Sequence, residues 1–92
     1  MYFALKWNED KNQILKRDRN ISFEDIELAI RQNKLLDIVK NPSKGHKNQY
    51  CLLVNIDNYV YIVPFVKDKE TFFLKTIYPS RKYTKIYLKA SL

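Results

Sequence analysis

The sequence predicts a single α+β domain in which helices flank a mostly antiparallel sheet. Two helix-start signals, at Asn8 and Ser22, occupy the first third of the chain, and several β-rich runs joined by short polar turns follow. The 92 residues are enough for one hydrophobic core and too few for two. We therefore expect a short N-terminal strand, two helices, a four-strand sheet and a basic C-terminal helix.

The first strand is expected over Tyr2–Trp7, where apolar side chains alternate with other residues. Asn8 can cap a helix from residue 9 to about 17, and the acids at its start suit the positive end of the helix dipole. Only Ile14 and Leu15 offer apolar contacts in this segment. We expect this helix to lie on the surface.

The second helix has a stronger start signal. Ser22 and Asp25 form a capping-box pattern, with Asp in place of the usual Glu or Gln, and Ile21 and Ile26 suit a hydrophobic staple. Apolar residues then recur at helical spacing to about Gln32. The core stripe predicted for this helix consists of Phe23, Ile26, Ala29 and Ile30.

The predicted sheet begins with a short apolar run over residues 35–39. The remaining strands are expected at Tyr50–Ile56, Tyr59–Val66 and Thr71–Tyr78. Short polar connections between these three runs are typical of hairpins, so an antiparallel meander is predicted.

Two local features of the meander carry specific expectations. Asp57 and Asn58 tolerate positive φ and suit a tight two-residue turn. Pro64 has no N–H for the strand ladder, so a bulge or an unpaired position is expected there. Cys51, in the apolar run of the preceding strand, is interpreted as a buried structural thiol.

The C-terminal segment carries the clearest functional signal. Ser80 can cap a helix from Arg81 to about Lys89, in which tyrosines and lysines occupy different faces. From Lys75 to the C-terminus there are five cations and no acid. One expected face holds Tyr83, Ile86 and Tyr87, and the other holds Lys82, Lys85 and Lys89.

The net charge of +7 is confined to one part of the chain. Residues 1–33 carry six cations and six anions, whereas residues 34–92 carry eleven cations and four anions. A one-sided basic surface interleaved with tyrosine suits a polyanion whose bases can stack, which indicates RNA or DNA. The alternative is a solvated basic helix without a ligand.

Other classes of protein are disfavoured. No disulfide framework and no signal-peptide pattern is present, so a cytoplasmic location is expected, and no apolar run approaches the roughly 20 residues that cross a bilayer. One histidine and one cysteine give no metal-ligand cluster, and a single glycine gives no phosphate-binding loop. We expect no cofactor and no metal.

RNA can be cleaved without a metal ion by cations and a proton-transfer group. Lys75, Arg81, Lys82 and Lys85 are candidates to hold phosphate, and Tyr78 or Tyr83 to stack on a base or position a proton. The loop residue His46 is either solvated or a general base, because its ordinary pKa lies near neutrality.

Both ends of the chain resemble BrnT-type toxins. The opening, Lys6-Trp7-Asn8-Glu9-Asp10-Lys11 followed by Lys16 and Asn20-Ile21-Ser22-Phe23-Glu24, is similar to their Trp-Asp, Lys and Lys-His-Gly-(Ile/Val)-Ser-Phe-Glu pattern. The close, Ile77-Tyr78-Pro79-Ser80-Arg81-Lys82-Tyr83-Thr84, resembles their Ile-Ile-Ser-Ala-Arg-x-Ala-Thr.

The resemblance implies a type II toxin of the RelE/ParE-like superfamily: a compact α+β ribonuclease that halts translation and is neutralised by a cognate antitoxin. Arg81 is the best matched functional residue, whereas Trp7, Ser22 and Phe23 match as structural residues. Arg19 and Asn20 replace the His and Gly of the pattern. Lys75 is the cation nearest to Thr76, which replaces an arginine of the pattern.

The predicted function is therefore a metal-independent endoribonuclease toxin whose partners are RNA and an antitoxin with an acidic or amphipathic segment. Two alternatives use the same surface: a non-catalytic nucleic-acid-binding module, and a protein-interaction domain that receives an acidic partner. The candidate catalytic residues are Arg81, Lys75, Tyr83 and His46, and the candidate nucleic-acid-binding residues are Lys82, Lys85, Lys89, Tyr78, Tyr87 and Thr84.

Overall fold

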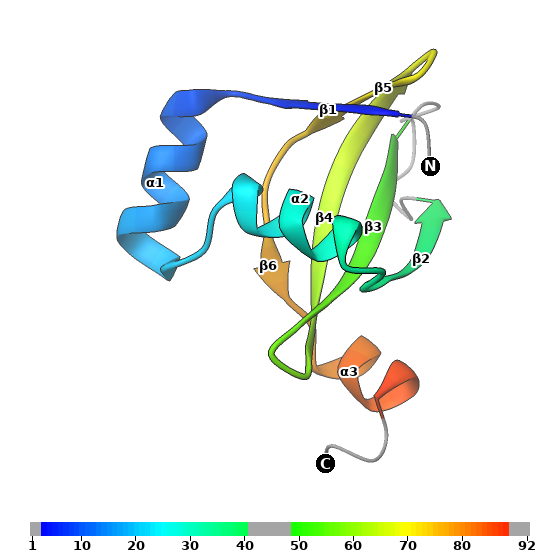
Figure 1. The fold of residues 1–92 in the computed structure, drawn as a ribbon. Helices are drawn as coiled ribbons and strands as arrows, with labels where there is room; N and C mark the ends of the chain where they lie inside the picture. Colours follow the sequence, from blue (N-terminus) through cyan, green and yellow to red (C-terminus); the bar gives the residue numbers. More distant parts are fainter. Residues whose placement is uncertain (1–2, 41–48, 89–92) are drawn as a thin grey trace.

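The computed structural model describes residues 3–40 and 49–88, and its α+β fold confirms the predicted class (Figure 1). One six-stranded sheet has the order β1-β5-β4-β3-β2, with β6 paired to β4. All pairings are antiparallel except that of β1 with β5. The elements are β1 (Ala4–Trp7), α1 (Glu9–Arg19), α2 (Phe23–Arg31), β2 (Leu35–Lys40), β3 (Gln49–Ile56), β4 (Tyr59–Asp68), β5 (Thr71–Leu74), β6 (Tyr78–Pro79) and α3 (Arg81–Tyr87).

The sheet differs from the predicted meander in two places. The N-terminal strand joins the same sheet, because β1 lies parallel to β5 at one edge. The run predicted as one strand over residues 71–78 is two strands, β5 and β6, which pair with different parts of β4. Periodicity along the chain could not show either feature, since both depend on which strands become neighbours.

Pro64 lies where β4 changes its neighbour, and no bulge forms there. The register with β3 continues through the pair Pro64–Cys51, so the predicted bulge is absent. The Pro64 carbonyl accepts a hydrogen bond of 2.8 Å from the Lys75 N–H, which places the imide nitrogen on the same side of the strand. That side faces the gap between β5 and β6, where the ladder requires no donor.

The hairpin between β3 and β4 has the predicted two-residue turn. Asp57 and Asn58 both adopt positive φ, at 53° and 62°. Two consecutive positive φ values define a type I′ turn, whose twist matches that of the flanking strands. This hairpin forms the longest ladder of the sheet, and its side chains contribute to an apolar cluster on each face.

Helix α2 covers one face of the sheet. Ser22 caps it with a complete capping box, and the predicted stripe residues Phe23, Ile26 and Ala29 are buried. They pack in a core with residues of the sheet that all point to the same side. These sheet residues are Leu52, Val54, Val63, Phe65, Phe72 and Leu74, joined by Ile77 from the segment after β5.

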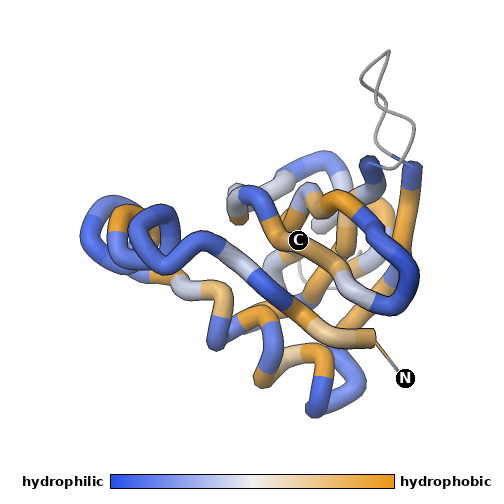
Figure 2. The backbone as a smooth tube through the Cα atoms, turned by 90° about the horizontal axis from the view of Figure 1, so that it is seen from above, coloured by the Kyte–Doolittle hydropathy of each residue, from blue (hydrophilic) through white to orange (hydrophobic). Residues whose placement is uncertain are grey.

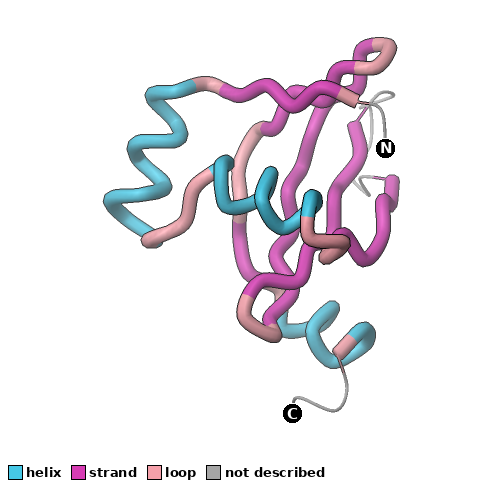
Figure 3. The backbone as a smooth tube through the Cα atoms, in the orientation of Figure 1, coloured by secondary structure: helices cyan, strands magenta, loops and turns pink. Residues whose placement is uncertain are grey.

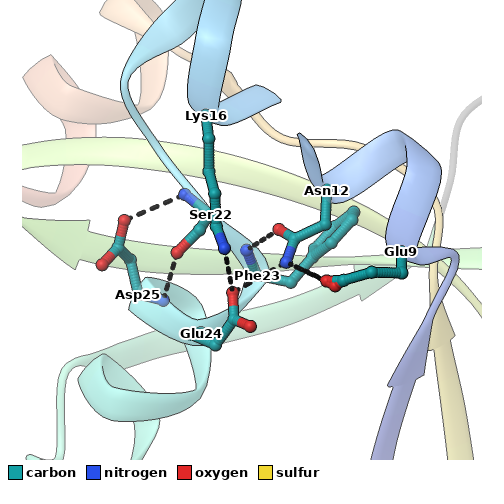
Figure 4. Close-up of polar contacts among 7 residues, drawn as sticks. All are labelled: Glu9, Asn12, Lys16, Ser22, Phe23, Glu24 and Asp25. Atoms are coloured by element: carbon teal, nitrogen blue, oxygen red, sulfur yellow. Dashed lines mark hydrogen bonds and ion pairs between the residues drawn. The ribbon is translucent and has the colours of Figure 1, made fainter. Parts of the chain in front are cut away.

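Helix α1 stands beside the sheet and is mostly hydrophilic along its length (Figure 2). The buried Leu15 joins the core, whereas Ile14 remains exposed. The side chain of Asn12, fully buried, accepts a 2.8 Å hydrogen bond from the Phe23 N–H and donates to Glu9 and Glu24 (Figure 4). This amide fastens α1 to the start of α2.

Helix α3 packs on the opposite face from α2, at the lower end of the sheet in Figure 3. A second apolar cluster there contains Cys51, Leu53, Val60 and Ile62, against which Tyr83 and Leu88 pack. The helix ends at Tyr87, before the predicted Lys89. Ile86 was predicted to share the tyrosine face, but its side chain is 51% exposed.

No helix within residues 3–40 and 49–88 has both the length and the apolar composition needed to cross a membrane.

Candidate nucleic-acid interface

The sheet face opposite α2 carries exposed aromatic and cationic side chains, and α3 packs at one end of this face. Along the edge of this face, Phe72 and Leu74 point into the core on the α2 side, and therefore Phe73 points the other way. Phe73 is 37% exposed, and the Lys75 ammonium lies 4.8 Å from the centre of its ring. The segment after β5 thus presents a ring with a cation above it.

Tyr78 continues the same face. Its cross-strand partner is Ile62, which belongs to the cluster under α3, so the two side chains share a side of the sheet. The ring is 39% exposed. Partial burial, and then the neighbouring Cys51 and Tyr83, raise the pKa of Tyr78. The phenol therefore keeps its proton at neutral pH, and its ring can stack while its hydroxyl donates a hydrogen bond.

Helix α3 adds a second ring with a cation above it. The Lys82 ammonium lies 5.7 Å from the centre of the Tyr83 ring, and Tyr83 packs against the apolar cluster of the sheet. Ser80 caps the helix by accepting a 3.1 Å hydrogen bond from the Tyr83 N–H, which fixes where the helix begins. We define the basic aromatic surface as Phe73, Lys75, Tyr78, Lys82 and Tyr83.

The cations of the basic aromatic surface and of α3 are not neutralised within residues 3–40 and 49–88. Lys75, Arg81, Lys82 and Lys85 are exposed, and none of them forms an ion pair with a carboxylate in those ranges. Helix α3 has no acid in its first turn. The ion pairs found in the described ranges involve Lys16, Arg17 and Arg31, which belong to α1 and α2. Positive potential therefore remains available to an anionic ligand.

Two of the residues predicted to contact nucleic acid make hydrogen bonds within the fold. Thr84 is fully buried: its hydroxyl accepts a 2.9 Å hydrogen bond from the Val60 N–H and donates one of 2.6 Å to the Ser80 carbonyl. Its predicted contact with nucleic acid is wrong for this structure, because the hydroxyl is enclosed and engaged. The Tyr87 hydroxyl donates to Asp37, so Tyr87 joins α3 to β2.

The structure places some of the other predicted site residues on the basic aromatic surface and does not describe two of them. Lys75, Tyr78, Lys82 and Tyr83 lie on the face of the sheet opposite α2, and the exposed Arg81 adjoins Lys82 at the first position of α3. His46 and Lys89, predicted as a general base and a phosphate contact, lie outside the described residues.

Sequence reasoning missed Phe73. The residue stands between two core residues in a β-rich run, and its neighbour Phe72 is buried, so composition does not separate the two phenylalanines. The available signal was strand alternation, since Phe73 and Lys75 are two residues apart and fall on the same face.

A cleft on the α2 side of the sheet has a different character. It has a volume of about 430 Å³ and contains both acids and cations, among them Asp25, Asp57 and Lys34. Arg19 borders this cleft, and its guanidinium already donates a 2.7 Å hydrogen bond to the Ile77 carbonyl. This cleft lacks the uniform positive charge of the basic aromatic surface.

No cluster of three or more His, Cys, Asp or Glu side chains suited to a metal ion occurs in the described parts of the chain. Comparison with protein families, with curated proteins and with solved structures finds no match.

Proposed function

We propose that this protein binds RNA through the basic aromatic surface. One observation carries the proposal: two lysines lie over two partly exposed aromatic rings on the same side of the molecule, with the exposed ring of Tyr78 on that side too. Lysine supplies phosphate contacts, and an aromatic ring accepts any base by stacking. The exposed Arg81, which forms no ion pair within the described ranges, extends the positive charge along α3.

The resemblance to BrnT-type toxins adds a reaction to this proposal, namely endonucleolytic cleavage of the bound RNA without a metal ion. The 2′-oxygen of one nucleotide attacks the adjacent phosphorus and loses its proton to a base, and the 5′-oxygen leaves with a proton from an acid. Arg81 and Lys82 then stabilise the charge that builds on the phosphate oxygens. Tyr78 is the candidate for that acid because its exposed phenol lies on this surface and carries a proton at neutral pH, not because of its raised pKa, which lowers its strength as an acid.

Two structural details are compatible with that resemblance. Asn20 replaces a glycine of the family pattern, and it adopts the left-handed conformation, with φ of 54°, that glycine takes most readily. Ser22 and Phe23, matched as structural residues, cap α2 and fill the core. An α+β domain with a basic C-terminal helix also suits the RelE-like scaffold that the resemblance implies.

The proposed protein partner is an antitoxin whose acidic segment neutralises the same cations. A protein-interaction domain without RNA binding is the competing interpretation, because exposed lysines on α3 attract acidic peptides as well as phosphates. Binding assays with RNA and with an acidic peptide separate the two: RNA binding favours our proposal, and binding to the peptide alone favours the alternative.

The reaction is tested by controlled expression and by incubation of purified protein with total RNA in the presence of a chelator. We expect growth arrest and RNA fragments from the natural sequence, and loss of both in Arg81→Ala. Arg31→Ala is the matched control, because Arg31 is also an exposed arginine but lies on α2, where it pairs with Glu27. This control should retain both activities.

The possible outcomes test RNA binding and RNA cleavage separately. Intact RNA together with salt-dependent RNA binding would leave the protein as a non-catalytic RNA-binding module. Full toxicity of a folded Arg81→Ala variant would remove Arg81 from the site. An absence of RNA binding by the natural sequence would overturn the proposal.

A further inference from the structure

We infer that the basic aromatic surface takes single-stranded RNA, with one base stacked on Phe73 and another on Tyr83, and that Lys75 and Lys82 leave these rings to contact phosphates. This inference rests on the proposed function and specifies the ligand of the same surface. It follows from the repetition of one arrangement, a lysine ammonium over a ring, on two separate elements of the fold.

The rings are held in fixed positions by their backbones. Phe73 lies in β5, where its neighbours Phe72 and Leu74 are buried in the core. Tyr83 lies in the first turn of α3, whose position is fixed by the hydrogen bonds of Thr84 to Val60 and Ser80. Rigid rings bind a base at a lower cost in conformational entropy than mobile ones.

The lysines, in contrast, can exchange one contact for another. Their side chains are exposed, and an exposed cation–π contact is worth only about 0.5–1 kcal/mol. A base that approaches Phe73 displaces the Lys75 ammonium, which then reaches the phosphate of the same nucleotide. Only the side chain of Lys75 moves in this exchange. Its backbone is held in place by the 2.8 Å hydrogen bond from its N–H to the Pro64 carbonyl.

The ligand must be single-stranded because stacking requires a free base face. In a duplex, each base is already stacked on its neighbours, and a protein reaches mainly phosphates and groove edges. Phe73 and Tyr83 belong to a strand and to a helix packed on the sheet, and neither extends from a loop that could enter a groove. A duplex would therefore use the lysines and leave the rings without partners.

The test is fluorescence anisotropy with three labelled probes of equal length: a single-stranded RNA, an RNA duplex and an abasic ribose-phosphate chain. We expect the first to bind more tightly than the other two. Phe73→Ala should weaken binding of single-stranded RNA at least about fivefold and leave abasic binding unchanged, as a lost stacking contact does. Lys75→Ala should weaken both and lower the salt slope by about one.

Two further variants keep the test decisive. Phe73→Leu retains apolar volume without a ring, and it should also weaken binding of single-stranded RNA while leaving abasic binding unchanged, which provides the same test if the alanine variant unfolds. Leu28→Ala is the control, because Leu28 is an exposed apolar residue on α2, away from the surface, and its substitution should change nothing.

The outcomes separate this inference from the proposed function. Equal affinity for the duplex, the abasic chain and single-stranded RNA, or unchanged affinity of both Phe73 variants for single-stranded RNA, would overturn the inference and leave RNA binding intact. Failure of all three probes to bind would overturn both.

Discussion

The Tyr87 hydroxyl donates a hydrogen bond of 2.7 Å to Asp37 Oδ2, and this bond joins the end of α3 to the edge strand β2. The same carboxylate accepts a 2.8 Å bond from the Ile38 N–H through Oδ1. Asp37 therefore ties the basic helix to the sheet and occupies an N–H of an edge strand, where an unpaired donor would invite another chain.

Replacement of Tyr87 by Phe should loosen the end of α3 without unfolding the domain. The hydrogen bond to Asp37 raises the pKa of Tyr87 above its ordinary value of about 10. A raised folded-state pKa means that the stabilisation is complete below the unfolded-state pKa and is lost as the pH rises through the folded-state pKa. Amide exchange over residues 84–88 should be faster in Tyr87→Phe at neutral pH.

The alkaline behaviour provides the check. In the natural sequence, amide exchange over residues 84–88 should become faster above about pH 10, where the hydrogen bond is lost. In Tyr87→Phe, which lacks this bond at every pH, no such additional loss of protection should occur. Identical exchange in both proteins at neutral pH would contradict the role assigned to the bond.

Replacement of Thr84 by Val should destabilise the domain by about 1–3 kcal/mol, because the buried Val60 N–H would lose its acceptor. Urea unfolding measures this difference. Thr84→Ser keeps the hydroxyl and should retain both hydrogen bonds and RNA affinity. A Thr84→Ser protein of normal stability with much weaker RNA binding would restore the contact predicted from the sequence.

Asn12 is predicted to be the main attachment of α1. Asn12→Ala leaves the buried Phe23 N–H without an acceptor and should cost about 1–3 kcal/mol of unfolding free energy. The control is Gln13→Ala on the neighbouring, exposed position of the same helix. Equal stability of the two variants, measured by urea unfolding, would show that the buried amide contributes little.

Low pH should weaken the junction between α1 and α2, because Glu24 becomes protonated. The Asn12 amide is the main cause of the lowered pKa of Glu24, and Lys16 adds a smaller attraction. A lowered folded-state pKa gives stability above the unfolded-state pKa of about 4.3, which is lost as the pH falls through the folded-state value. Glu24→Gln should therefore be less stable than the natural sequence at pH 7 and lose less stability below pH 4. Parallel pH profiles from denaturant melts would contradict this.

The sequence predicted the elements whose signals are local. Asn8, Ser22 and Ser80 cap helices as expected, and the Asp57-Asn58 turn has the expected positive φ values. Side-chain chemistry adjacent in the chain determines these features. The parallel pairing of β1 with β5 and the division of the last predicted strand depend on contacts between distant segments.

The candidate site was predictable to a similar extent. Charge and tyrosine content indicated residues 75–87, but they could not distinguish the partly buried Tyr83, which pairs with Lys82, from the fully buried Thr84 beside it. Burial of Thr84 depends on α3 packing against β4, which no helical period reveals. The exposure of Phe73 could be predicted only by knowing which face of β5 the core covers.

The most direct test of the central claim is an NMR titration of the ¹⁵N-labelled protein with a short single-stranded RNA. We predict that amide shifts concentrate at residues 73–75, 78 and 81–83, with little change in α1 and α2. Shifts centred instead on the cleft around Lys34 and Asp57, or no saturable shifts at all, would contradict the assignment of RNA binding to the basic aromatic surface.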